Sequence, residues 1–164
     1  MKKNKRFIYI GNLILMVIIV AYVSKYWYQL GLIQGKSMEP SYHNFQFVIL
    51  KKNIDPSDIR QGDVIVFKCD ELQETLVKRV VAVPNQKVVI KSGSLYIDGK
   101  LSPVYPSGIF DNAGILQKEV VLKNSEYIVI GDNISKSKDS RSKEVGVLEF
   151  KDIRGKVIFP RKSY

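Results

Sequence analysis

The chain has almost no histidine and almost no cysteine. Its 164 residues include one histidine, His43, and one cysteine, Cys69. A single cysteine excludes an internal disulfide, and a single histidine leaves little scope for an imidazole base beside a nucleophilic serine. Cys69 is a weak candidate nucleophile, because nothing near it in the sequence lowers a thiol pKa. We interpret it as a free, structural thiol.

Acidic residues are few as well. The chain has 26 lysines and arginines against 16 aspartates and glutamates, a net charge of +10. Such a balance suggests either nucleic acid or an anionic membrane surface as a partner. The distribution of charge favours membrane lipid over nucleic acid. Residues 7–24 carry no charge, and a basic cluster directly precedes them, made up of Lys2, Lys3, Lys5 and Arg6.

The uncharged segment is long enough to cross a bilayer. A helix over residues 7–28 would be about 33 Å long at about 1.5 Å per residue, against a hydrocarbon core of about 30 Å. The positive-inside rule then leaves residues 1–6 in the cytoplasm and residues 29–164 as an extracytoplasmic domain at the cell membrane. Four aromatic residues would form a belt at the outer interface: Tyr22, Tyr26, Trp27 and Tyr28.

A cleavable secretory signal is the competing interpretation of this segment, since it too has a basic start and an apolar core. The apolar run is long for a signal peptide. Ala21-Tyr22-Val23 lies inside the run, and Ser24 leads into large residues. No convincing small-x-small cleavage site therefore follows, and a retained transmembrane helix is favoured.

Beyond the anchor, short apolar or alternating runs are separated by turn residues, which predicts a mainly β domain with its own core. A turn or a single helical turn is expected at residues 55–58, and residues 102–114, rich in Pro, Gly, Ser and Asn, are the best candidate for a mobile loop. The predicted strands cover residues 46–51, 63–68, 75–83, 87–91, 94–97, 119–122, 127–130 and 155–159.

Ser37 and Lys78 are the two residues whose chemistry could be combined. A neutral lysine can accept a serine proton, but an exposed ammonium with a pKa of about 10.4 is almost wholly charged at neutral pH. Lys78 lies in the apolar run 76–81, and burial on such a strand would lower its pKa. Neighbouring side chains point to opposite faces of a strand, so Arg79 should face water or a carboxylate.

Four boxes in a fixed order resemble the type I signal peptidases, which are membrane-bound Ser/Lys endopeptidases. Residues 35–40, 62–67, 78–84 and 131–141 match the family's serine box, Gly-Asp strand, Lys-Arg box and Gly-Asp-Asn…Ser-x-Asp-Ser-Arg box. The resemblance spans about residues 7–158. It implies a signal-peptidase, LexA-like β-fold and cleavage of the signal peptides of exported preproteins, with no cofactor and no metal.

The resemblance also implies the catalytic roles. Ser37 would attack the scissile carbonyl, and neutral Lys78 would take its proton as the general base, giving an acyl-enzyme that water hydrolyses. The backbone N–H of Ser37 would be the main oxyanion donor. Some relatives add a hydroxyl two residues earlier, where this chain has Gly35, so the oxyanion would rely on backbone donors or on Lys36.

Four supporting residues come from the last box by the same resemblance. Ser137 would hydrogen-bond to the lysine and orient it. Asp139 and Arg141 would form a salt bridge that holds the box in place, and Asp132 would be a further supporting acid.

Substrate binding is expected by β-strand addition, in which an extended peptide pairs with exposed strand edges. By similarity these edges are residues 32–34 and 75–77, with small pockets for Ala-like residues at the first and third positions before the cut. Met38 is also expected to rest on the bilayer surface. The proposed substrate-binding residues are Ile33, Gln34, Met38, Leu76 and Val77. All of them except Gln34 could equally be core residues.

The chain departs from the family pattern at two places. Ile134 stands where the family commonly has Arg, and residues 142–146 replace a shorter aromatic-Gly continuation. Two extra lysines, Lys136 and Lys138, lie close to the expected site. These changes favour a peptidase dedicated to particular exported substrates over a general one.

Three other functions remain as alternatives. The chain could be an assembly factor or chaperone for surface proteins such as pili, with little proteolysis. A penicillin-interacting enzyme fits Ser-x-x-Lys at residues 140–143, but no Lys-Thr-Gly box is present. A self-cleaving repressor would need a DNA-recognition helix where the apolar span lies.

Overall fold

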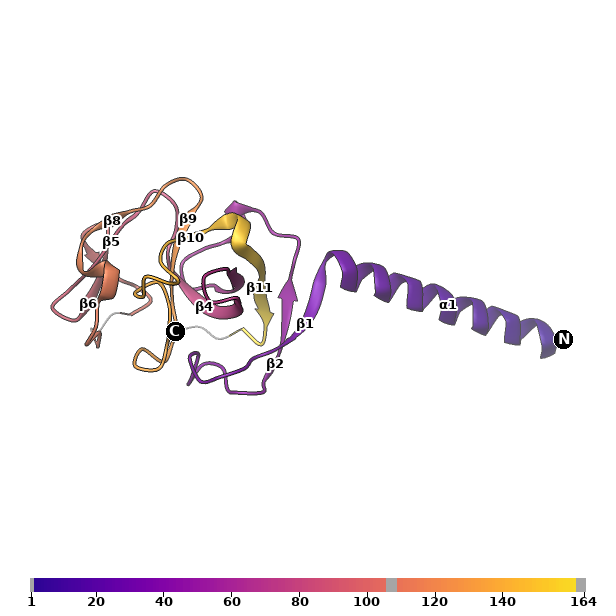
Figure 1. Cartoon of the computed structure of the whole chain (residues 1–164). Coiled ribbons are helices and arrows are strands. Elements are labelled where there is room, and N and C mark those ends of the chain that lie inside the picture. Colours follow the sequence, from indigo (N-terminus) through magenta and orange to yellow (C-terminus); the bar gives the residue numbers. More distant parts are fainter. Residues whose placement is uncertain (1, 106–108, 162–164) are drawn as a thin grey trace.

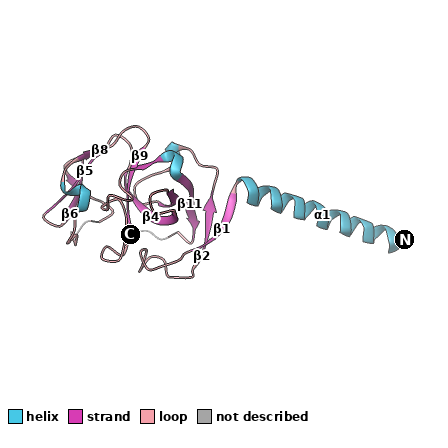
Figure 2. Ribbon diagram, viewed as in Figure 1, coloured by secondary structure: helices cyan, strands magenta, loops and turns pink. Residues whose placement is uncertain are grey.

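One long helix and a mainly β domain make up the molecule (Figure 1). The computed structural model describes residues 2–105 and 109–161. Helix α1 projects alone from one side of the β domain, as Figure 2 shows by secondary structure. The remaining helices of the described residues are single 3₁₀ turns: η1 (Pro56–Asp58), η2 (Gly114–Gln117) and η3 (Phe150–Asp152). The predicted fold class is confirmed, as is the helical turn at residues 55–58.

Helix α1 covers Lys2–Tyr26, and Lys5–Tyr26 is long and apolar enough to cross a membrane. The helix ends two residues before the predicted limit. Trp27 N–H still donates to the Val23 carbonyl over 2.8 Å, but the Trp27 carbonyl accepts from Lys52 N–H, also over 2.8 Å. From Tyr28 onward the backbone pairs with a strand, which satisfies its polar groups as a longer helix would have done.

A seven-stranded antiparallel sheet forms the larger part of the domain, in the order β1-β2-β11-β3-β4-β9-β10. Its register places Ile65 of β3 opposite Lys78 of β4, so the predicted base lies on an interior strand of the sheet. The strands are β1 (Tyr28–Leu32), β2 (Phe47–Lys51), β3 (Val64–Cys69), β4 (Glu74–Ala82), β9 (Glu126–Ile130), β10 (Leu148–Glu149) and β11 (Ile153–Phe159).

A second, four-stranded antiparallel sheet has the order β7-β6-β5-β8. It lies on the side of the domain away from α1 (Figure 1). A shared core that includes Val81, Leu95 and Ile130 joins the two sheets. The strands are β5 (Lys87–Lys91), β6 (Ser94–Ile97), β7 (Lys100–Leu101) and β8 (Val120–Val121).

Two further hydrophobic cores are formed by side chains of the larger sheet. One packs Phe67, Val80 and Tyr127 against each other. The other holds the segment around the predicted nucleophile, because Met38 and Tyr42 are buried there with Val66. The nucleophile segment is therefore anchored in apolar packing on its C-terminal side.

All eight predicted strands are confirmed to within two residues at each end, but β1, β7 and β10 were not predicted. β7 and β10 have only two residues each, too few for a pattern of alternation. In residues 102–114, Tyr105 and Phe110 are buried, so both flanks of the predicted loop belong to the core. Residues 106–108 lie outside the described residues, and mobility there stays a prediction.

Candidate active site

Ser37 and Lys78 meet although 41 residues separate them. Ser37 lies in the turn after β1 and Lys78 lies on β4, with Lys78 Nζ 2.7 Å from Ser37 Oγ. A serine hydroxyl and an amine at this separation can exchange a proton directly. The two side chains singled out from the sequence therefore form one site.

The surroundings of Lys78 favour its neutral form. The side chain is 2% exposed, and its Nζ also donates to the Val77 carbonyl over 3.0 Å. Burial lowers the pKa of Lys78 from 10.5 to about 8, against the opposing charges of Asp139 and Asp132. At pH 7 about a tenth of such lysines are neutral, against less than about 0.1% of exposed ones.

Two hydrogen bonds fix the turn that carries the nucleophile. Gly35 has a φ of 89°, a conformation that favours glycine, and its N–H donates to Asn44 Oδ1 over 2.9 Å. The Ser37 carbonyl accepts from Asn133 N–H over 3.0 Å. One bond ties the turn to the following loop and the other ties it to the last box, so Ser37 is held from both sides.

Donors for an oxyanion are limited near Ser37. The Gly35 N–H is already used by Asn44, and the Lys36 side chain is exposed. Within residues 2–105 and 109–161, no hydrogen bond engages the Ser37 N–H. That N–H is therefore available to a developing oxyanion.

Arg79 faces a carboxylate, as its position on the strand predicted. Arg79 and Asp132 form a two-point ion pair between fully buried side chains, with Nε–Oδ1 at 2.8 Å and Nη2–Oδ2 at 2.6 Å. Arg79 Nη1 also donates to the Gly62 carbonyl over 2.7 Å, and the Tyr105 hydroxyl donates to Asp132 Oδ1 over 3.1 Å. This network ties three of the four boxes together behind the lysine.

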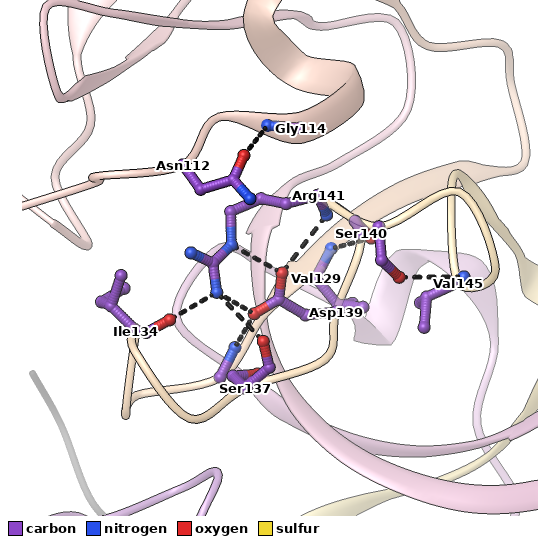
Figure 3. A network of polar contacts seen from close by, with 11 residues as sticks. Asn112, Gly114, Val129, Ile134, Ser137, Asp139, Ser140, Arg141 and Val145 are labelled. Atoms are coloured by element: carbon purple, nitrogen blue, oxygen red, sulfur yellow. Dashed lines mark hydrogen bonds and ion pairs between the residues drawn. The ribbon is translucent and has the colours of Figure 1, made fainter.

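The predicted salt bridge between Asp139 and Arg141 is confirmed (Figure 3). Arg141 Nε lies 2.8 Å from Asp139 Oδ1, and Nη2 lies 2.9 Å from Oδ2. The same Nη2 donates to the Ile134 carbonyl over 2.7 Å, and Asp139 accepts from Gly131 N–H over 3.1 Å. The pair thus closes residues 131–141 into one rigid loop.

The contact expected from Ser137 to Lys78 is not formed. Ser137 Oγ is buried, and it has no hydrogen-bond partner among the described residues. Lys78 Nζ is directed instead at Ser37 Oγ and the Val77 carbonyl. A Cβ at Gly131 would overlap Ser137 Oγ and would come within 2.5 Å of the Ser37 carbonyl, so Ser137 lies close to the nucleophile through the space that Gly131 leaves open.

One expected substrate edge is open. β4 pairs with β3 along Glu74–Arg79, but β9 covers its other side only from Arg79 onward. Residues 75–77 therefore present an unpaired edge next to Lys78, where Leu76 and Val77 are partly exposed. Such an edge can accept an extended peptide.

The other expected substrate-binding residues differ in their surroundings. Gln34 is exposed beyond the end of β1. Ile33 and Met38 are 2% and 1% exposed and pack in the core with Tyr42, so they anchor the turn that carries Ser37 to this core. The expectation that Met38 rests on the bilayer is wrong, because its side chain is enclosed.

The two departures from the family pattern lie in the last box and directly after it. Ile134 is largely buried, and its carbonyl serves Arg141. Residues 142–146 form a turn closed by Gly146 N–H to the Ser142 carbonyl at 2.9 Å. Lys138, one of the two extra lysines, is paired there with Glu144 at 3.0 Å. Both dyad residues keep their geometry beside these changes.

Sequence reasoning missed Asn44, Asn133 and Tyr105 as contributors to the site. Asn133 acts through its backbone, and its place in the last box was the only signal for it. Asn44 and Tyr105 lie in segments without a recognisable pattern, and each reaches the site through a side-chain hydrogen bond.

Comparisons with known proteins agree with this geometry. The family model described as "Signal peptidase, peptidase S26" matches residues 6–161. Signal peptidase I of Bacillus licheniformis is 28% identical over 97% of this chain and 91% of its own length. Signal peptidase IB of Staphylococcus aureus (strain COL) is 31% identical over 77% of this chain and 74% of its own length.

A solved signal peptidase I from Enterococcus faecalis V583 is 22% identical and covers 61% of this chain and 97% of that chain, with a TM-score of 0.49. The family match and the relatives do not favour the alternative of an assembly factor for surface proteins. The chain belongs to the signal peptidase family, peptidase S26, and its function is that of a type I signal peptidase, a serine peptidase acting on the signal peptides of exported proteins.

Proposed function

We propose that Ser37 and Lys78 are the catalytic dyad of this peptidase. The observation that carries the proposal is the 2.7 Å separation of Ser37 Oγ and Lys78 Nζ, with Lys78 buried. Neutral Lys78 takes the hydroxyl proton while Ser37 Oγ attacks the scissile carbonyl. The protonated lysine then returns a proton to the leaving amine, and water hydrolyses the acyl-enzyme.

The surrounding residues act as supports in this proposal. The free N–H of Ser37 stabilises the oxyanion. Asp132 neutralises Arg79 directly behind the lysine, and Asp139 with Arg141 keeps the last box against the Ser37 carbonyl. Ser137 supports the site from beside Gly131, where its buried hydroxyl lies next to the segment that donates a hydrogen bond to the Ser37 carbonyl.

The signal peptide binds as an added strand. Its residues before the cut pair with residues 75–77 of β4, where the edge is free. Leu76 and Val77 shape the pockets for the first and third residues before the cut, with Gln34 on the opposite side. Ile33 and Met38 contribute as buried support.

Membrane anchoring places the site near its substrates. Residues 5–26 span the cell membrane with the short N-terminus in the cytoplasm, and the domain that begins after the helix lies outside. One face next to α1 carries large apolar side chains, 42–68% exposed, that suit lipid contact: Leu30, Leu32, Phe45, Phe47 and Phe159. This face takes the place of Met38 as the surface on the bilayer.

The test is cleavage of a membrane-inserted preprotein with an Ala-x-Ala site by the full-length chain in vesicles. Ser37→Ala and Lys78→Ala should each abolish cleavage with the fold and membrane insertion retained. Lys91→Ala, which removes an exposed lysine of β5, is the matched control and should cleave normally. Full activity in either dyad variant would contradict the proposal.

A further inference from the structure

A cavity of about 860 Å³ lies beside the dyad. Its walls come from Glu39 and Pro40, in the turn that carries the nucleophile, from most of residues 132–142, and from three residues of the segment 109–112. Ser137 belongs to its lining, and the same serine approaches the Ser37 carbonyl across Gly131. The cavity and the dyad therefore share a wall.

The walls of this cavity are tied together. Ile115 N–H donates to the Arg141 carbonyl over 2.9 Å, and Asn112 Oδ1 accepts from Gly114 N–H over 2.9 Å. Figure 3 shows Asn112 and Gly114 beside Arg141, whose guanidinium reaches Asp139 and Ile134. The cavity is thus formed before any peptide binds.

The path of the substrate leads to this cavity. If the residues before the cut pair with residues 75–77, the scissile bond lies at Lys78. The chain after the cut cannot continue along β4, because β9 occupies that edge from Arg79 onward. It must leave the sheet where β9 ends, next to Gly131, and the cavity begins there.

The charges of the cavity are unbalanced. Four charged side chains of its lining belong to ion pairs. Asp139 and Arg141 pair with each other, while Asp132 and Lys138 pair with Arg79 and Glu144, which lie outside the lining. The other two, Glu39 and Asp111, form no ion pair with the residues that the structure describes. Both carboxylates are at least partly exposed, so a cationic ligand could reach them.

We propose that this cavity binds the first residues of the mature chain and that Glu39 and Asp111 select a basic side chain there. The inference rests on the proposed function and adds a substrate preference to it. Pro40, Ile109 and Ile134 supply apolar contact for the stem of a lysine or arginine. The whole chain carries a net charge of +10, so an overall electrostatic effect would favour acidic peptides instead.

The experiment compares two peptides that are identical through the Ala-x-Ala site. One carries Lys-Lys at the second and third positions after the cut, and the other carries Glu-Glu. The full-length chain in neutral detergent should cleave the lysine peptide with a kcat/KM about tenfold higher at low salt, as expected for two partly exposed charge pairs. The ratio should fall at roughly 0.5 M salt, where the charges are screened.

Variants separate the cavity from the rest of the surface. Glu39→Gln with Asp111→Asn should bring the ratio close to one. Glu71→Gln with Glu119→Gln removes two exposed carboxylates outside the cavity lining and should leave the ratio unchanged.

Two results would overturn the inference alone, namely equal cleavage of both peptides by the parent chain, or an unchanged ratio in the cavity variant. Cleavage of neither peptide would overturn the proposed function and the inference with it.

Discussion

Replacing Lys78 by methionine should stabilise the protein while it abolishes cleavage. The charged lysine is enclosed by the sheet at 2% exposure, and burial lowers its pKa from 10.5 to about 8. At pH 7 the folded state holds a charge in a place that disfavours it. Methionine fills the space of the lysine stem without a charge.

The size of the effect follows from the pKa. A shift of about 2.5 units at about 1.36 kcal/mol per unit corresponds to about 3 kcal/mol of destabilisation by the charged lysine. The variant loses hydrogen bonds to Ser37 and the Val77 carbonyl, worth about 1 kcal/mol each. The free energy of unfolding at pH 7 should therefore rise by about 1–2 kcal/mol in Lys78→Met, the sum of these opposing contributions.

The sign of the pH dependence is a sharper test. Below pH 8 Lys78 is protonated in both states, so the folded parent chain carries the full penalty. Between about pH 8 and 10.5 the unfolded state still binds the proton and the folded state does not, so the stability of the parent chain rises with pH. The advantage of Lys78→Met should shrink over that window and reverse to a deficit at its upper end.

Denaturant unfolding of the full-length chain in mild detergent, monitored by the near-UV circular dichroism of its aromatic residues, measures these differences in the free energy of unfolding. Lys91→Met is the control, because its lysine is exposed on the smaller sheet and should give a difference near zero at every pH. A Lys78→Met variant that is less stable than the parent at pH 7, or a difference independent of pH, would refute the reasoning.

Three further predictions concern the supports of the site. Gly131→Ala places a Cβ against the Ser37 carbonyl and the Ser137 hydroxyl, so kcat in a peptide-cleavage assay should fall by about 100-fold or more while the circular dichroism spectrum is retained. An unchanged kcat would argue against the close approach of these groups to Gly131. Asp132→Ala leaves Arg79 buried without its carboxylate and should lower the free energy of unfolding by about 3–5 kcal/mol in denaturant titrations; a loss below about 1 kcal/mol would contradict it. Asn44→Ala removes the hydrogen bond from Gly35 N–H and should lower kcat about tenfold with little change in KM. Asn44→Asp keeps the acceptor oxygen and should retain most of the parent kcat. Steady-state kinetics that show only a KM effect would exclude a positioning role for Asn44.

Much of the site could be predicted because its residues lie in short boxes with strict spacing. The Asp139–Arg141 pair joins neighbours in one box, and strand alternation turns Arg79 toward the face opposite Lys78, where it meets a carboxylate. Local geometry decides such contacts, so a local pattern predicts them. The dyad joins two boxes 41 residues apart, and it could be predicted only because the order of the boxes resembles a known family.

The contacts that could not be predicted depend on packing between distant segments. The orientation of Ser137 follows from how the last box approaches the Ser37 carbonyl, and only the absence of a side chain at Gly131 permits that approach. The strand β1 continues an apolar, aromatic run whose composition predicts a helix. Its pairing with β2 stabilises the extended conformation instead. Tyr105 reaches Asp132 from a segment whose composition indicates only a loop.

The pH dependence of cleavage tests the central claim, a neutral Lys78 acting as the base for Ser37, most directly. With a peptide carrying an Ala-x-Ala site, kcat/KM of the parent chain should rise with pH as Lys78 loses its proton, with a midpoint near its pKa of about 8. Lys78→Ala should show no cleavage at any pH. A flat profile across that range, or cleavage by Lys78→Ala, would contradict the account.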